Sequence, residues 1–187
     1  MDRENRNKGF SLIELIVTIA VMAVVTGATM SIYSWIRTHR LTSMAESMDS
    51  AIGDLRSVTL AKSGKYQLVI KQDSGDYVAF LQKSDTTDAL GNPIWNTIDT
   101  TTIGSKGDIS FFDNISGTEY FVSSSSDIQI IISFNKSDGS FSNIAWEDTS
   151  TGVSGTNNIK DSEIAVTYAG KTKTVKLVQL TGKHYIK

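Results

Sequence analysis

The chain of 187 residues contains no cysteine, a single proline and two histidines, His39 and His184. Without cysteine there is no disulfide framework, zinc–thiolate site, iron–sulfur cluster or cysteine nucleophile. The two histidines lie far apart in the sequence, and no Gly-x-Ser-x-Gly, phosphate-binding glycine loop or His-Glu-x-x-His motif is present. The sequence therefore predicts a protein that is not an enzyme and that needs no cofactor or metal.

Charge is also modest, because only 20% of the residues are charged and the formal net charge is −2. A slightly acidic chain is a poor general coat for nucleic acid. Hydrophobic residues make up 40% of the sequence, which is typical of a globular protein rather than a disordered one. The length suits one domain or two small ones.

A long apolar run occurs once, from Leu12 to Met30, and its only charged residue is Glu14. At a rise of 1.5 Å per residue this run is about 28 Å long, close to the thickness of the hydrocarbon core of a bilayer. The residues before it include Arg3, Arg6 and Lys8. Basic residues favour the cytoplasmic side, so the pattern predicts one membrane span with the rest of the chain outside the cytoplasm.

The acid within this run needs an explanation, because an acidic side chain costs about 3 kcal/mol in the middle of a membrane. A secretory signal peptide cut after Ala28 would leave Thr29 as the new N-terminus. A plain membrane anchor would keep Met1. In both interpretations Glu14 is only tolerated near the interface, whereas an intramembrane carboxylate is otherwise a candidate functional group.

The residues around the acid, Lys8-Gly-Phe-Ser-Leu-Ile-Glu14, resemble the processing site of type IV prepilins and pseudopilins. In that family a short charged leader ends in Gly, the next residue is usually Phe, and a Glu follows four positions later. The resemblance implies a leader over residues 1–9 that is removed after Gly9, an N-methylated terminus at Phe10 and an assembly role for Glu14. It also implies three kinds of partner: other pilin or pseudopilin subunits, a prepilin peptidase/methyltransferase and a membrane assembly platform.

The spacing within this motif has a chemical rationale. Cleavage after Gly9 would create a positive amine on Phe10 at the head of a helix, and Glu14 would lie one helical turn further on. In a helical stack, the carboxylate of one subunit would meet the amine of its neighbour. Each charge is costly to bury alone, so pairing would stabilise both and set the axial register.

Helical periodicity continues beyond the apolar run and predicts one helix over residues 10–62, with the membrane and assembly segment at 12–30. No proline interrupts it, and Gly64 is a plausible stop. Its apolar stripe consists of Ile32, Trp35 or Ile36, Leu41, Met44, Met48, Ile52 and Leu55. We expect the second half of this stripe to pack on the chain's own sheet. Such a helix would be about 75–80 Å long.

Residues 63–187 are predicted to form a globular head rich in β-strands. Apolar runs separated by turn residues predict hairpins at 66–81, 127–146 and 163–180, and shorter strands near 109–112 and 119–122. Segments 84–107 and 148–160 are rich in Thr, Ser, Gly, Asn and Asp and are predicted to be long surface loops. The predicted class is therefore α+β, a long helix packed on an antiparallel sheet, which is the plan of type IV pilins.

The C-terminal segment 164–182 resembles the end of H-type minor pseudopilins, which finish with a strand, a turn, a second strand and a Gly-basic tail. This resemblance and the proline-free helix favour a minor subunit. The tail would contain His184, for which the sequence indicates no partner. Without cysteine, sheet pairing and burial alone must hold the last predicted strand.

Two pairs of carboxylates in predicted turns, Asp73 with Asp76 and Asp85 with Asp88, are candidate calcium ligands. Calcium requires six to eight oxygen ligands, and neither pair belongs to a recognisable calcium loop. Asp is also a common turn residue in its own right. The sequence therefore favours turns over a calcium site.

Four lysines near the end of the chain, Lys171, Lys173, Lys183 and Lys187, are candidate contacts to DNA phosphates in a competence-type pilus. Lysines on an edge strand also discourage unwanted strand pairing, and we favour that simpler interpretation. A nucleic-acid partner is therefore an alternative to the main prediction.

A second alternative is a membrane-anchored or secreted β-rich module that binds a sugar or another ligand, with Trp95 and Trp146 in or near loops. The main prediction remains a structural minor pilin or pseudopilin. It would be inserted in the cytoplasmic membrane by a single span, with its head outside the cytoplasm. After processing it would join a pilus-like or secretion-type fibre at the cell surface or in the envelope.

Overall fold

The structure is a computed structural model that describes residues 10–123, 127–156 and 161–187. The chain divides into two compact units, Met1–Thr38 and His39–Lys187. Helix α1 (Leu12–Ala61) runs through the end of the first unit and the beginning of the second. It ends three residues before Gly64, whose φ of +117° is a conformation that glycine adopts readily. The single long helix that the periodicity predicts is confirmed.

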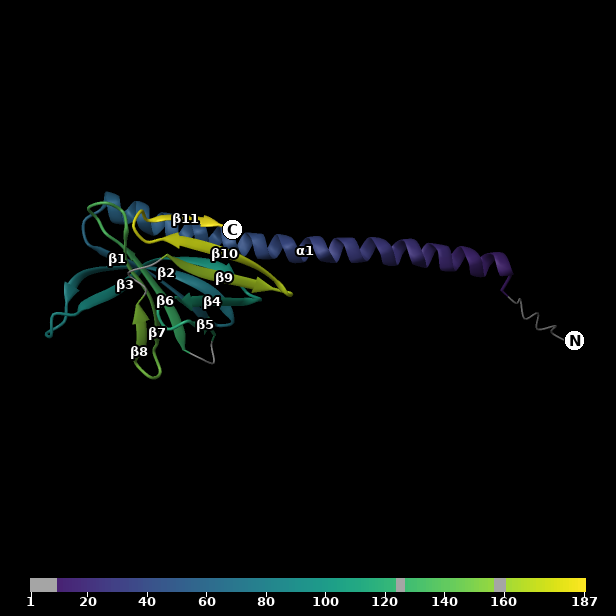
Figure 1. Cartoon of the computed structure of the whole chain (residues 1–187). Helices are drawn as coiled ribbons and strands as arrows, with labels where there is room; N and C mark the ends of the chain where they lie inside the picture. The colour runs from purple at the N-terminus through teal and green to yellow at the C-terminus, as the bar shows by residue number, and fades with distance from the viewer. Residues whose placement is uncertain (1–9, 124–126, 157–160) are drawn as a thin grey trace, which may run out of the picture. The chain divides into compact units, whose positions relative to one another are not determined.

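Within the described residues, the strands of the second unit form two antiparallel sheets (Figure 1). The first sheet has the strand order β3 (Pro93–Gly104), β2 (Asp76–Thr87), β1 (Lys65–Asp73), β6 (Ile128–Phe134), β7 (Phe141–Asp148) and β8 (Val153–Thr156). The second has the order β11 (Lys183–Ile186), β10 (Lys171–Val178), β9 (Ser162–Tyr168), β4 (Asp108–Asp113) and β5 (Thr118–Val122). One long helix with antiparallel sheets is an α+β fold consistent with the type IV pilin fold.

The three predicted hairpins and the two shorter strands are confirmed. Two of the hairpins turn through pairs of residues with positive φ, Ser74-Gly75 and Ala169-Gly170. This geometry is that of a type I′ turn, whose twist matches the twist of the strands that it joins. The β1–β2 turn fixes a register in which Leu68 lies opposite Leu81, so both side chains point to the core face.

The two predicted surface loops are wrong in large part. Segment 84–107 contains the end of β2 and all of β3, and segment 148–160 contains β8. Residues 157–160 of the second segment lie outside the described residues. Strand β3 is an edge strand whose side chains are mostly exposed, which is why its Thr-rich sequence lacks the apolar alternation of a buried strand.

The core lies between the second half of α1 and the two sheets. The helix contributes buried Leu41, Met44, Met48, Ile52 and Leu55, as the apolar stripe predicts. The earlier residues of the stripe differ, because Ile32, Trp35 and Ile36 are exposed. Tyr120 of β5 stacks on Trp146 of β7 with ring centroids 3.6 Å apart, which joins the two sheets.

The predicted C-terminal tail is also wrong, because the residues after Gly182 form β11, which pairs with β10 and lies beside the second half of α1 (Figure 1). His184 on this strand has a partner after all: its Nδ1 is 2.7 Å from Oδ1 of Asp49 on the helix. The end of the chain is therefore held by a polar contact in addition to sheet pairing and burial.

Candidate processing and assembly site

The first turn of α1 is built around Ser11 and Glu14. The Ser11 hydroxyl oxygen accepts a hydrogen bond from the Glu14 N–H at 3.3 Å, and Oε2 of Glu14 accepts one from the Ser11 N–H at 2.9 Å. Since the helix begins at Leu12, these residues occupy the N-cap and N3 positions of a reciprocal capping box. The carboxylate is thus turned back toward the start of the helix and toward Phe10.

Electrostatics favour an anion at this end of a helix. The first backbone N–H groups of a helix lack intrahelical partners, and the peptide dipoles leave partial positive charge there. Glu14 places its carboxylate at that charge, which offsets part of the cost of an acid in an apolar segment. The same geometry leaves the carboxylate next to the position that a cation on Phe10 would occupy after cleavage.

Phe10 precedes the helix, and its side chain is 83% exposed. Gly9, the other residue of the predicted cleavage bond, lies outside the described residues. The two residues before Leu12 are not helical.

The apolar run presents only exposed side chains, because every residue from Phe10 to Gly27 is exposed. Within the described residues, α1 is the helix that is long and apolar enough to cross a membrane. Its threonine hydroxyls are satisfied internally: Thr18 donates to the Glu14 carbonyl, and Thr26 donates to the Met22 carbonyl at 2.7 Å. The surface of this segment is therefore suited to lipid or to the helices of other subunits.

Comparisons with known proteins agree with this interpretation of the N-terminus. The sequence family described as the prokaryotic N-terminal methylation motif matches residues 5–30. This match supports a type IV pilin-like family and includes Gly9, Phe10 and Glu14. No curated protein and no solved structure matches the chain significantly.

The carboxylates that were candidate calcium ligands serve turns and an ion pair. Asp73 and Asp76 lie opposite each other where the β1–β2 hairpin turns. Oδ2 of Asp85 is 2.8 Å from Nζ of Lys83, and Asp88 accepts hydrogen bonds from the backbone N–H groups of Leu90 and Asn92. Within the described residues, no group of three or more acidic or histidine side chains is placed to hold a metal ion.

The four candidate DNA-contacting lysines are spread over two strands. Lys171 begins β10, whereas Lys183 begins β11 and pairs with Val178 at the other end of β10. Seven residues of strand separate these two positions by about 23 Å. Lys187 exchanges backbone hydrogen bonds with Thr174, so its side chain lies on the face opposite to that of Lys173. The structure therefore does not gather the four lysines on one surface.

The two tryptophans also have different settings. Trp146 is 6% exposed and forms part of the core, so it offers no open face to a ligand. Trp95 on β3 is partly buried and lines a cavity of about 380 Å³ together with Phe134 and Asn143. Both tryptophans therefore lie within strands rather than in loops.

Two features of the site and its surroundings escaped the sequence reasoning. The capping box has a recognisable sequence signal, Ser-x-x-Glu before an apolar run, but the sequence analysis considered Glu14 without Ser11. The contact of Asp49 with His184 has no local signal, since 135 positions separate the two residues.

Proposed function

We propose that this chain is a structural subunit of a pilus-like or secretion-type fibre, cut after Gly9 and assembled through its N-terminal helix. The observation that carries the proposal is the Ser11–Glu14 capping box at the head of an exposed, membrane-length apolar helix. It places the only acid of the apolar run beside the position that cleavage would charge. The match to the N-terminal methylation motif supports the same function.

Assembly would follow from an exchange of hydrogen-bond donors at Glu14. In the free subunit, Oε2 of Glu14 accepts from the neutral Ser11 N–H. The amine of a neighbouring subunit is a charged donor, and charge-assisted hydrogen bonds are roughly twice as strong as neutral ones. In an apolar surrounding the two charges stabilise each other, so a neighbour's Phe10 amine would hold the carboxylate in the fibre.

The chain would act through assembly rather than catalysis, as a minor subunit of the pseudopilin type. Support for the minor role comes from the proline-free helix and from the resemblance of segment 164–182 to H-type pseudopilins. The proposed partners are other pilin or pseudopilin subunits, a prepilin peptidase/methyltransferase and a membrane platform. The head, residues 63–187, would lie outside the cytoplasm on a single span.

The N-terminus of the protein isolated from membranes tests the processing step. We expect mass spectrometry to find a chain that begins with N-methylated Phe10. Recovery of the chain with Met1 and the leader intact would show a plain anchor and contradict the proposal. A chain that begins at Thr29 would show a cleaved secretory signal and would contradict it as well.

Replacement of the acid tests the assembly step. Glu14→Ala should be inserted and processed but should enter fibres at least tenfold less, because every 1.4 kcal/mol lost from pairing is a factor of ten. Ser11→Ala is the matched control: it removes a capping hydroxyl at the same turn and keeps the carboxylate, so it should still be incorporated. Normal incorporation of Glu14→Ala would contradict the assembly role.

A further inference from the structure

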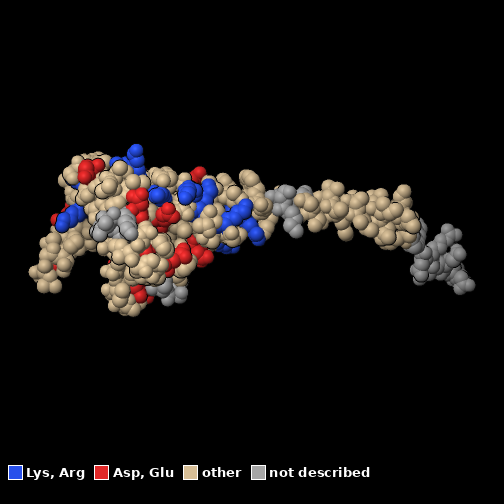
Figure 2. Space-filling view, in the orientation of Figure 1, with Lys and Arg blue, Asp and Glu red and all other residues tan. Residues whose placement is uncertain are grey.

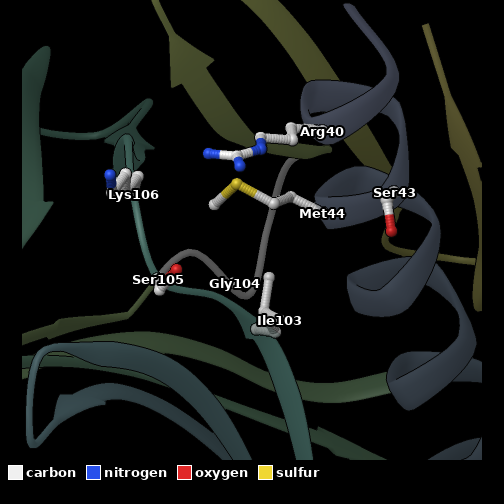
Figure 3. A pocket seen from close by; sticks show the side chains of 7 residues that line it. All are labelled: Arg40, Ser43, Met44, Ile103, Gly104, Ser105 and Lys106. Carbon is white, nitrogen blue, oxygen red and sulfur yellow. The ribbon is translucent and has the colours of Figure 1, made fainter. Parts of the chain in front are cut away.

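A cavity of about 370 Å³ lies within the second unit, between the part of α1 that begins this unit and the turn that joins β3 to β4. Arg40 on the helix and Lys106 on the turn both line it (Figure 3). The Arg40 guanidinium extends above the Met44 thioether toward the side on which Lys106 lies (Figure 3). Two cations from distant parts of the sequence thus share one cavity.

Among the residues that the structure describes, no acidic side chain lines this cavity. Within the described part of the chain, neither Arg40 nor Lys106 forms an ion pair. Nη1 of Arg40 donates a long hydrogen bond of 3.4 Å to the Tyr168 hydroxyl. Elsewhere on the head unit, charged groups of both signs are interspersed (Figure 2). The described residues therefore leave two cations at this cavity without an acidic partner, which suits an anionic ligand.

The floor of the cavity is apolar and closely packed. Met44 is 4% exposed and lies against Gly104, where an added Cβ would come within 2.7 Å of its Cγ. The Ser43 and Ser105 side chains supply hydroxyl groups at the lining. A fitting ligand thus combines an oxyanion for Arg40 and Lys106 with hydroxyl or aliphatic parts that contact the serines and Met44.

The chain position of Arg40 indicates which oxyanion is within reach. Arg40 follows Met30, the end of the apolar run, by ten positions. Ten residues of helix span at most about 15 Å, whatever angle the two units adopt. The headgroup layer occupies roughly 5–7 Å on each side of the hydrocarbon, and long basic side chains extend toward it. Lipid phosphates are therefore the membrane oxyanions nearest to this point of the chain, and the Arg40 side chain would have to cover the remaining distance.

We propose that Arg40 and Lys106 form a binding site for the phosphodiester headgroup of an anionic phospholipid. The proposal rests on the membrane insertion of the proposed function, but not on cleavage after Gly9. Arg40 would hold the phosphate through two guanidinium N–H groups, Lys106 would contribute a second charge, and the glycerol part would contact Met44.

Native mass spectrometry of the full, uncleaved chain in a neutral detergent tests this proposal. The probes are phosphatidylglycerol, phosphatidylcholine and inorganic phosphate, each added separately and in competition. We expect phosphatidylglycerol adducts to exceed phosphatidylcholine adducts. In the double variant Arg40→Gln/Lys106→Gln, the ratio of phosphatidylglycerol adducts to phosphatidylcholine adducts should fall at least tenfold.

The matched control is Lys62→Gln/Lys136→Gln, which also removes two positive charges but at sites that do not line the cavity. It keeps the basic leader and should retain the adducts. Equal binding of the two lipids, equal loss in the control, or retention in the double variant would overturn the proposal. Displacement of phosphatidylglycerol by equimolar inorganic phosphate would show that the site binds free anions, and it would contradict the proposal of a lipid ligand.

A thermal unfolding curve shows whether the double variant is folded. If the double variant unfolds at a lower temperature than the natural chain, the single variant Lys106→Gln replaces it in the binding test. Lys106 is exposed on a turn, and its substitution should still reduce the phosphatidylglycerol adducts severalfold. All measurements use the uncleaved chain, so a failure of processing at Gly9 leaves this test intact. Loss of fibre incorporation in Glu14→Ala is likewise independent of lipid adducts.

Discussion

Single aspartates organise several turns of the head. Oδ1 of Asp138 accepts hydrogen bonds from the N–H and the hydroxyl of Ser140 at 2.9 and 2.7 Å. Asp148 makes the same two contacts with Ser150. The backbone hydrogen bond from Ser140 is the main cause that lowers the pKa of Asp138, and the hydroxyl of Ser150 is the main cause for Asp148. These carboxylates stabilise the fold only while they are ionised.

The lowered pKa values predict how stability depends on pH. Unfolded Asp has a pKa of about 3.9, so the contribution of Asp138 is complete above that pH and is lost as the pH falls through its lower folded pKa. We expect the midpoint of thermal unfolding to fall from pH 5 to pH 3. At pH 7 the Asp138→Asn variant should unfold at a lower temperature than the natural chain. Its unfolding midpoint should also fall less between pH 5 and pH 3.

Asp54→Asn is the matched control for that measurement. Asp54 is exposed on α1, outside the turns of the head, so its substitution should leave the slope between pH 5 and pH 3 unchanged. A slope that is identical in all three proteins would contradict the role given to Asp138.

Residues with local roles were the ones that the sequence predicted best. The turn residues Ser74-Gly75 and Ala169-Gly170 act on their immediate neighbours, so their positions could be inferred before the structure. The N-terminal motif is local as well, and the capping box now gives Glu14 a defined orientation. Arg40 and Lys106 could not be paired in advance, because the cavity between them depends on how distant segments pack.

At the scale of elements, the short strand β11 closes one edge of the second sheet against α1. It pairs with β10 from Val175 to Val178, and His184 reaches the helix at Asp49. The His184 ring also lies 3.6 Å from the position that a Cβ on Gly53 would take, so it packs on the helix surface itself. The strand is short, and this side-chain contact adds to the backbone pairing that holds it.

A double-mutant cycle with Asp49→Ala and His184→Ala measures that contact. We expect each single variant to lower the free energy of unfolding and the pair to show a coupling energy of about 0.5–1.5 kcal/mol, as for a typical hydrogen bond. Denaturant unfolding at constant pH gives the four values. Additive effects, with no coupling beyond experimental error, would show that the contact contributes nothing to stability.

Elements with strong local patterns were predictable, and those that depend on neighbours were not. The strands of the three predicted hairpins alternate apolar residues and end at turn signals. Strand β3 lacks such alternation because both its faces are largely exposed, and β11 has only 4 residues. Both were missed because pairing with β2 and β10, not their own composition, holds them in the sheets.

At the scale of the whole molecule, the buried core belongs to the second unit. Within the described residues, the first buried side chain along the chain is that of Leu41, and those before it are exposed or partly exposed. The apolar run therefore contributes nothing to the core that stabilises the head. The order of strands in the two sheets is equally a property of the whole, and the sequence alone did not predict it.

Removal of residues 1–30 tests this division. We expect the shortened chain to unfold cooperatively without detergent, at a midpoint within about 3 °C of the full chain in mild detergent, which corresponds to about 1 kcal/mol. Ile52→Ala in the shortened chain is a positive control: Ile52 is fully buried, so its truncation should cost about 2–5 kcal/mol. The absence of a cooperative transition would show that the apolar segment supports the head.

The contact between Asp49 and His184 also determines when folding can finish. The ribosome must add 135 further residues after Asp49 before His184 exists to cover that face of the helix. Contacts between such distant residues form slowly, because the intervening chain must first be ordered. The second unit therefore cannot complete its fold during most of its synthesis, because β11 must be made before this edge of the sheet can close against the helix.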